Sequence, residues 1–230
     1  MTEFVLVHGS GQNARSWARV AAILRLRGHR VVTPELVKDD GALGLEHHAA
    51  AITDHLTTHR AVLVAHSLCG VFVPLVAARS KIARMVFVAA VIPEPGRSVR
   101  EQFAADAGMF HAQWIAAGAR WRDPVQREAL ARDFLFHDAA AATLPFALAT
   151  MEPMDTRAVV VEPCPLDALP RVPSTVIVAA RDRTLTADWC AGAARRLLHV
   201  EPHLVDSGHC PQVVRPVLVA DLLERAATED

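Results

Sequence analysis

Length, composition and charge narrow the kinds of protein that this chain can be. It has 230 residues, 52% of them hydrophobic, and a formal net charge of −1 at pH 7, which suits one domain with a large core. The near-neutral charge argues against a nucleic-acid partner or an anionic membrane surface, and no apolar run reaches the roughly 18 residues of a membrane span. The chain enters its first apolar run without a basic leader, which predicts a cytoplasmic protein.

The predicted elements alternate along the chain. Strands are expected at residues 3–8, 30–33, 61–65, 84–90, 174–180 and 202–206. Helices are expected at 14–27, 42–58, 68–79, 187–198 and 213–227, with Gly28 closing the first of them. Short apolar strands separated by helices predict a mostly parallel sheet with helices on both faces.

Residues 94–172 interrupt this alternation between the fourth and fifth predicted strands. They hold helical stretches rich in alanine and large apolar residues, and then a run of prolines. We expect a helical lid here over a core made of residues 1–93 and 173–230. Most of its apolar side chains should pack the lid on the core, but a few should contact the substrate, and our candidates are Phe110, Trp114 and Phe136.

A serine stands at a predicted junction between a strand and a helix. Ser67 follows the apolar run 61–64 and precedes a helix-compatible run, with small residues two positions away on each side. This is the pattern of a nucleophile elbow, a strained turn that exposes the serine hydroxyl. The small residues are Ala65 and Cys69 where the usual motif has two glycines, so a buried serine in an ordinary turn is the alternative.

Two further residues follow Ser67 in an informative order. Asp182 ends one predicted strand and His209 follows another. A nucleophile, an acid and a base in this chain order are typical of α/β hydrolases, in which histidine takes the serine proton and the carboxylate orients the histidine. The alternatives are that Asp182 caps the helix near Thr186, or that Asp206 is the acid.

A glycine loop follows the first predicted strand. It reads His8-Gly9-Ser10-Gly11, and such a loop can bring a backbone N–H to a developing oxyanion. We therefore expect the N–H groups of Ser10 and Leu68 to form an oxyanion hole, with Gly9 bordering the substrate.

The remaining histidines and the cysteines suggest no metal site or cofactor. His66 is expected to be structural, and four histidines should be solvated on a surface helix: His47, His48, His55 and His59. The four cysteines are scattered without a CxxC pair, so they predict neither a disulfide framework nor a zinc site. A homodimer is compatible with the sequence, which does not specify the oligomeric state.

These motifs resemble the plant methylesterase and hydroxynitrile lyase branch of the α/β hydrolases and its bacterial esterase relatives. The resemblance runs through residues 4–11, Trp17, 27–32 and 66–68, then Asp182 and 207–209, and more loosely through 134–138. It implies a small helical cap, a triad of Ser67, Asp182 and His209, and oxyanion amides from Ser10 and Leu68.

The sequence departs from the lyases of that branch at two positions. The similar hydroxynitrile lyases carry a lysine directly after the catalytic histidine and a threonine directly after the oxyanion-loop histidine, where this chain has Cys210 and Gly9. Because the lysine would stabilise a departing cyanide, cyanohydrin cleavage is disfavoured. The sequence predicts a serine carboxylesterase for small apolar esters. Acyl transfer, C–C bond lysis and a ligand-binding degenerate hydrolase remain alternatives.

Overall fold

The computed structural model describes residues 1–38 and 40–229. Its centre is one sheet of six parallel strands in the order β2-β1-β3-β4-β5-β6. The strands are β1 (Glu3–Val7), β2 (Arg30–Val32), β3 (Val62–His66), β4 (Arg84–Val88), β5 (Ser174–Ala179) and β6 (His203–Val205). All six predicted strands are therefore present, and the sheet is parallel throughout the described residues.

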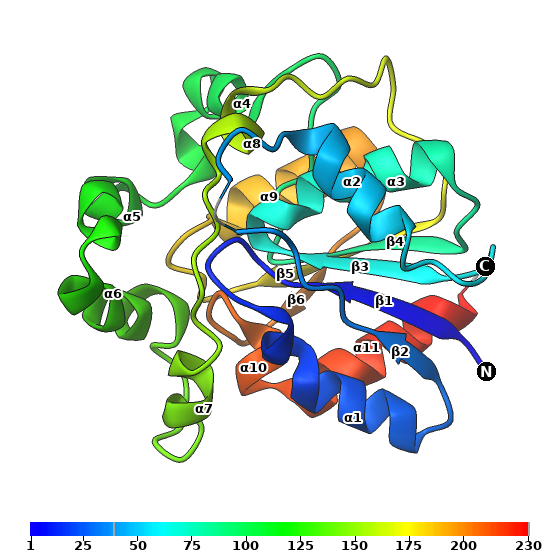
Figure 1. Cartoon of the computed structure of the whole chain (residues 1–230), viewed down its shortest axis with the longest axis horizontal. Coiled ribbons are helices and arrows are strands. Elements are labelled where there is room, and N and C mark those ends of the chain that lie inside the picture. The colour runs from blue at the N-terminus through cyan, green and yellow to red at the C-terminus, as the bar shows by residue number, and fades with distance from the viewer. Residues whose placement is uncertain (39, 230) are drawn as a thin grey trace.

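Helices cover both faces of the sheet, as Figure 1 shows. One face carries α1 (Ala18–Leu26), α10 (Pro211–Val214) and α11 (Pro216–Thr228), and the other carries α2 (Leu45–Thr53), α3 (Val73–Arg79) and α9 (Ala187–Ala193). Successive residues of a strand point to opposite faces of the sheet, and each face has its own hydrophobic cluster. Phe4 and Leu6 pack in the cluster with α1 and α11, whereas Val5 and Val7 pack in the cluster with α2 and α3.

The predicted helices exist but divide into shorter pieces. A 3₁₀ turn precedes α1, another occupies Ser67–Phe72 before α3, and a π-helical turn extends α9 to Leu198. Gly28 has φ +86° directly after the first helix, which confirms it as the closing residue. The second helix is shorter than expected and ends at Thr53.

Besides 3₁₀ and π-helical turns, the segment 94–172 holds five short α-helices. They are α4 (Val99–Ala105), α5 (Ala112–Ala117), α6 (Pro124–Leu130), α7 (Leu144–Leu148) and α8 (Arg157–Val161). Figure 1 shows the helices of this segment beyond the carboxyl ends of the strands, and the chain after α8, in yellow, running back to the start of β5. The apolar side chains of the segment form a third cluster with Cys210 and Val213 of the core. None of the helices formed by the described residues is long and apolar enough to cross a membrane.

One expectation about the surface is wrong. His47, His55 and His59 are exposed, but His48 is only 1% exposed and packs its ring 5.1 Å from that of Phe72. The helical period places His48 on the inner face of α2 together with Leu45 and Ile52. Burial, aided by the charge of His47, lowers the pKa of His48 to about 4.

Candidate active site

Ser67 occupies a strained turn directly after β3. Its φ is +57°, in the left-handed region that non-glycine residues rarely adopt. The turn is tight on its inner side, because a Cβ on Gly70 would lie 2.4 Å from the backbone oxygen of Val91. Ala65 and Cys69 are both fully buried there, so the fold accommodates alanine and cysteine where the usual motif has glycines.

Ser67, His209 and Asp182 lie in hydrogen-bond contact. His209 Nε2 is 2.9 Å from Ser67 Oγ, and His209 Nδ1 is 2.7 Å from Asp182 Oδ2. Since a carboxylate only accepts, Nδ1–H donates to Asp182, and Nε2 is left to accept from the serine hydroxyl. His209 and Asp182 are 3% and 7% exposed, so water weakens this chain of contacts little.

The structure decides between Asp182 as the partner of His209 and the two alternative interpretations. Helix α9 is capped by Thr186, whose side chain accepts from the N–H of Trp189, so Asp182 is not the cap of that helix. Asp206 is exposed, and its carboxylate pairs with Arg181 at 2.6 Å. Asp182 is therefore the carboxylate that contacts His209.

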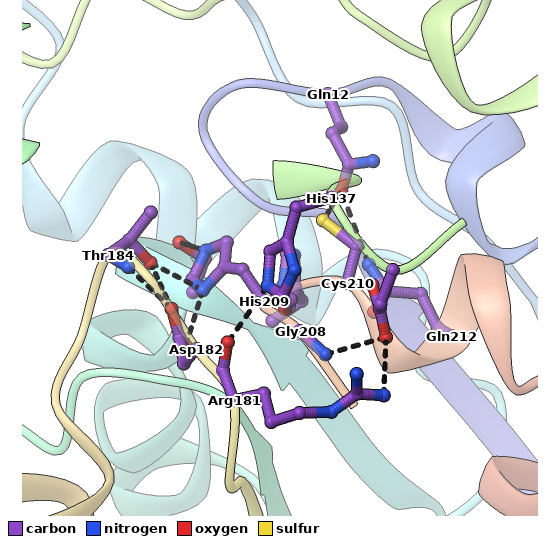
Figure 2. Close-up of polar contacts among 12 residues, drawn as sticks. Gln12, His137, Arg181, Asp182, Thr184, Gly208, His209, Cys210 and Gln212 are labelled. Carbon is purple, nitrogen blue, oxygen red and sulfur yellow. Dashed lines mark hydrogen bonds and ion pairs between the residues drawn. The ribbon is translucent and has the colours of Figure 1, made fainter. Parts of the chain in front are cut away.

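Thr184 is a member of the site that the sequence reasoning missed. Its N–H and its hydroxyl both donate to Asp182 Oδ1, each at 2.7 Å. The same hydroxyl oxygen is 2.6 Å from His209 Nδ1, as Figure 2 shows. An aspartate side chain often accepts from the backbone N–H two residues further on, and this tendency could have drawn attention to the position of Thr184.

His66 supports the backbone beside the site, which agrees with its expected structural role. Its Nε2–H donates to the backbone oxygen of His209 at 2.8 Å. Burial, and then the charge of His209, lower the pKa of His66 well below its usual value. The ring is therefore neutral near pH 7.

The loop after β1 approaches the serine closely. A Cβ on Gly9 would lie 2.6 Å from His66 Nδ1 and 3.1 Å from the Cβ of Ser67, so glycine is required for this approach. The backbone oxygen of Ser10 accepts from Met154 N–H, and that of Gly11 accepts from Glu152 N–H. Both contacts tie the loop to the segment 94–172.

A cavity of about 430 Å³ opens above Ser67, a volume that suits a small organic ligand. Gly9, Ser10, Leu68, Phe110 and Trp114 line it, as do Ser67 and His209. Other apolar lining residues, which the sequence reasoning did not select, include Phe103, Trp121, Met151, Met154 and Leu185. The wall is thus mostly apolar, and half of its lining residues come from the segment 94–172.

Phe136 differs from its expectation as a substrate contact. It is 2% exposed and packs in the cluster with Leu135, Ala147 and Val213, outside the cavity lining. Its neighbour Leu135 reaches the cavity instead. The local helical phase decides which of two adjacent side chains faces the ligand.

Metal-binding groups are absent from the part of the chain that the structure describes. Residues 1–38 and 40–229 contain no group of three or more His, Cys, Asp or Glu side chains that could hold a metal ion. All four cysteines are buried free thiols. Burial raises the pKa of Cys210, which lies beside His209, well above its usual value, so its thiol is neutral at pH 7.

Comparisons with known proteins agree with this geometry. Residues 4–222 match the model of the alpha/beta hydrolase family. The chain is 36% identical over 107 residues to the probable esterase PIR7A of Oryza sativa subsp. indica, which covers 41% of each protein. It is 30% identical over 153 residues to a carbendazim hydrolyzing esterase of a Nocardioides species, covering 56% of this chain and 62% of that one.

Solved structures show the same fold over the full length. An extracellular alpha/beta-hydrolase from a Paenibacillus species superposes with a TM-score of 0.78 at 22% identity, covering 100% of both chains. The methylesterase MES16 from Arabidopsis gives 0.74 at 17% identity, covering 99% of both. The match to the rice relative spans about two fifths of that relative's length. The match to the family model spans residues 4–222, almost the whole of this chain. The chain belongs to the alpha/beta hydrolase family.

Proposed function

We propose that this protein is a serine-dependent hydrolase that cleaves small apolar carboxylic esters through an acyl-enzyme intermediate. The observation that carries the proposal is the chain of contacts from Ser67 to His209 to Asp182 at the floor of an apolar cavity. Relatives named as esterases, including methyl jasmonate esterase 1 of Vitis vinifera, support the same reaction class.

Ser67 is the nucleophile in this mechanism. A serine hydroxyl is a weak nucleophile at neutral pH, so it needs a base to take its proton as it attacks the ester carbonyl. His209 Nε2 lies at hydrogen-bond distance for that transfer. Asp182 holds the ring through Nδ1 and stabilises the imidazolium that forms.

Stabilisation of the oxyanion and departure of the alcohol complete the first half of the reaction. The backbone N–H groups of Ser10 and Leu68 are the donors that we assign to the oxyanion, because both residues border the cavity beside Ser67. His209 then returns its proton to the departing alcohol oxygen. In the second half, His209 takes a proton from a water molecule that attacks the acyl carbonyl. It then returns that proton to Ser67 Oγ as the bond to the serine breaks and the carboxylic acid leaves.

The cavity wall suggests the substrate class. Phe110 and Trp114 provide apolar surface from the segment 94–172, which we propose acts as a lid over a core of residues 1–93 and 173–230. Gly9 borders the cavity and lets its loop pack against His66 and Ser67. Apolar walls favour an apolar acyl or alcohol group over a charged one.

Ester hydrolysis measured for the wild type beside Ser67→Ala tests the proposal. With p-nitrophenyl esters from acetate to dodecanoate, we expect turnover by the wild type and a loss of at least about a thousandfold in kcat for Ser67→Ala. The chain-length optimum measures the usable depth of the cavity. Turnover by Ser67→Ala at the wild-type rate would rule out the serine mechanism. An inactive wild type would favour acyl transfer, C–C bond lysis or ligand binding at this site.

A further inference from the structure

Two adjacent residues of the lid segment contact both loops that carry the partners of Ser67. His137 Nε2–H donates to the backbone oxygen of Arg181 at 2.9 Å, directly before Asp182, as Figure 2 shows. Asp138 Oδ2 accepts from the N–H of Gly208 at 2.8 Å and from the Ser207 hydroxyl at 3.2 Å, directly before His209. The loops of the acid and of the base are thus both held by residues 137–138.

Asp138 is a buried carboxylate that pairs with Arg181. Its side chain is 1% exposed, and Arg181 Nη2 lies 3.6 Å from Oδ2. Burial of a charged group is unfavourable unless hydrogen bonds compensate for the lost water. The two donors from the His209 loop do so at Oδ2, whereas Oδ1 accepts no hydrogen bond from the described residues. The fit is close, because a Cβ on Gly208 would lie 2.7 Å from Asp138 Oδ1 and from His137 Nε2.

We propose that Asp138 is a positioning residue that sets the orientation of His209 toward Ser67. Asp138 holds the N–H of Gly208, before His209, while His66 holds the backbone oxygen of His209 itself. The backbone is therefore fixed on both sides of the histidine. This restricts where the imidazole can point, and Nε2 stays at contact distance from Ser67 Oγ.

The position of Asp138 within the lid segment has a consequence for turnover. The core holds Ser67, Asp182 and His209, but part of the support of His209 comes from residues 94–172. A displacement of residues 137–138 would remove the acceptor of the Gly208 N–H. The lid segment therefore helps to align His209 and also lines part of the cavity.

Kinetics of Asp138 variants test the inference, which rests on the proposed hydrolase function. With p-nitrophenyl butyrate, we expect Asp138→Ala to lower kcat at least about tenfold with KM changed less than about threefold, because the loss is in alignment and the cavity wall is intact. Asp138→Asn keeps an oxygen acceptor for the Gly208 N–H, so its kcat should be clearly closer to that of the wild type. The rate at which a fluorophosphonate labels Ser67 should fall in parallel with kcat.

Asp206→Ala is the matched control. Asp206 lies in the same loop and also pairs with Arg181, but it is exposed, so its removal should leave kcat unchanged. A folded Asp138→Ala protein with wild-type kcat and labelling rate would overturn the inference. If Asp138→Ala does not fold, Gly208→Ala crowds the same carboxylate, and an unchanged kcat there would overturn the inference equally. Absence of Ser67-dependent turnover in the wild type would instead refute the proposed function.

Discussion

Thr184 places one hydroxyl between the side chains of Asp182 and His209. The hydroxyl donates to Asp182 Oδ1, and Thr184 is only 2% exposed. A hydrogen bond to a buried charged group contributes about 1.5–3 kcal/mol. Without it, Oδ1 would retain only the Thr184 N–H among the contacts described above.

Thr184→Val is therefore expected to impair catalysis. The substitution keeps the side-chain shape but removes the donor, and we expect kcat to fall about tenfold, or about 1.4 kcal/mol in the barrier. Steady-state kinetics with a p-nitrophenyl ester measure the effect. Thr186→Val is the control, because it removes the cap of α9 and should lower the melting temperature without lowering kcat. Equal kcat in Thr184→Val and wild type would contradict a role for this hydroxyl.

The residues that could be found from sequence are those whose role follows from their place along a strand. Ser67, Asp182 and His209 each lie beyond the carboxyl end of a strand, and parallel strands bring those ends to one edge. Asp138 could not be found in this way. Its partners lie 69 and 70 residues away, and only the packing of the lid brings them together.

At the scale of elements, α5 contributes an aromatic wall to the cavity. Trp114 packs 4.9 Å from Trp121 and 5.6 Å from Phe134, ring centre to ring centre, and it lines the space above Ser67. Its ring therefore limits the room available to the substrate on that side.

Trp114→Ala is expected to change substrate preference. The loss of roughly 1.5 kcal/mol of apolar contact should lower kcat/KM for the shortest esters about tenfold, while the enlarged cavity should shift the optimum to longer acyl chains. The measurement is kcat/KM across the p-nitrophenyl ester series. Ile115→Ala is the control, since Ile115 is 44% exposed on the same helix and should leave the profile unchanged. An unshifted optimum in Trp114→Ala would contradict this assignment of the wall.

Helix α2 carries a buried histidine that should make stability depend on pH. The pKa of His48 is lowered to about 4, mainly by burial, whereas an unfolded histidine titrates near 6.5. The unfolded state therefore binds more protons between these values. The contribution of His48 to stability is complete above about pH 6.5 and is lost as pH falls toward 4.

His48→Leu should flatten this dependence. Urea unfolding at several pH values between 7 and 4 gives the free energy of unfolding, which we expect to fall less steeply in His48→Leu than in the wild type. The control is His55→Leu, because His55 is exposed and near the same helix. Equal slopes in the wild type and His48→Leu would show that His48 does not titrate differently on folding.

Element boundaries were harder to predict than element types. The apolar runs of β3, β4 and β5 are long enough to mark strands buried on both faces. The helix predicted at 68–79 instead begins as a 3₁₀ turn around Ser67, because the backbone turns sharply there. His48 and Phe136 were misplaced for a related reason: the face that a helical residue presents depends on phase and on what packs against it.

At the scale of the whole molecule, the parallel sheet and the segment 94–172, which we propose to be a lid, contribute different parts of the site. The sheet brings the ends of β3, β5 and β6 to one edge, where the three side chains meet. The segment 94–172 adds half of the residues that line the cavity and the contacts of His137 and Asp138 to the core. The sheet could be predicted from strand patterns. The packing of the lid could not, because its helices are short and their contacts are tertiary.

The proposed mechanism requires Ser67 to be the nucleophile of a working hydrolase. Its most direct test is covalent trapping with a fluorophosphonate, followed by mass spectrometry of the intact protein and of its peptides. We expect one adduct per chain, located on Ser67 and absent from Ser67→Ala, with ester turnover lost in proportion to labelling. Full turnover by protein whose Ser67 is completely modified would contradict it.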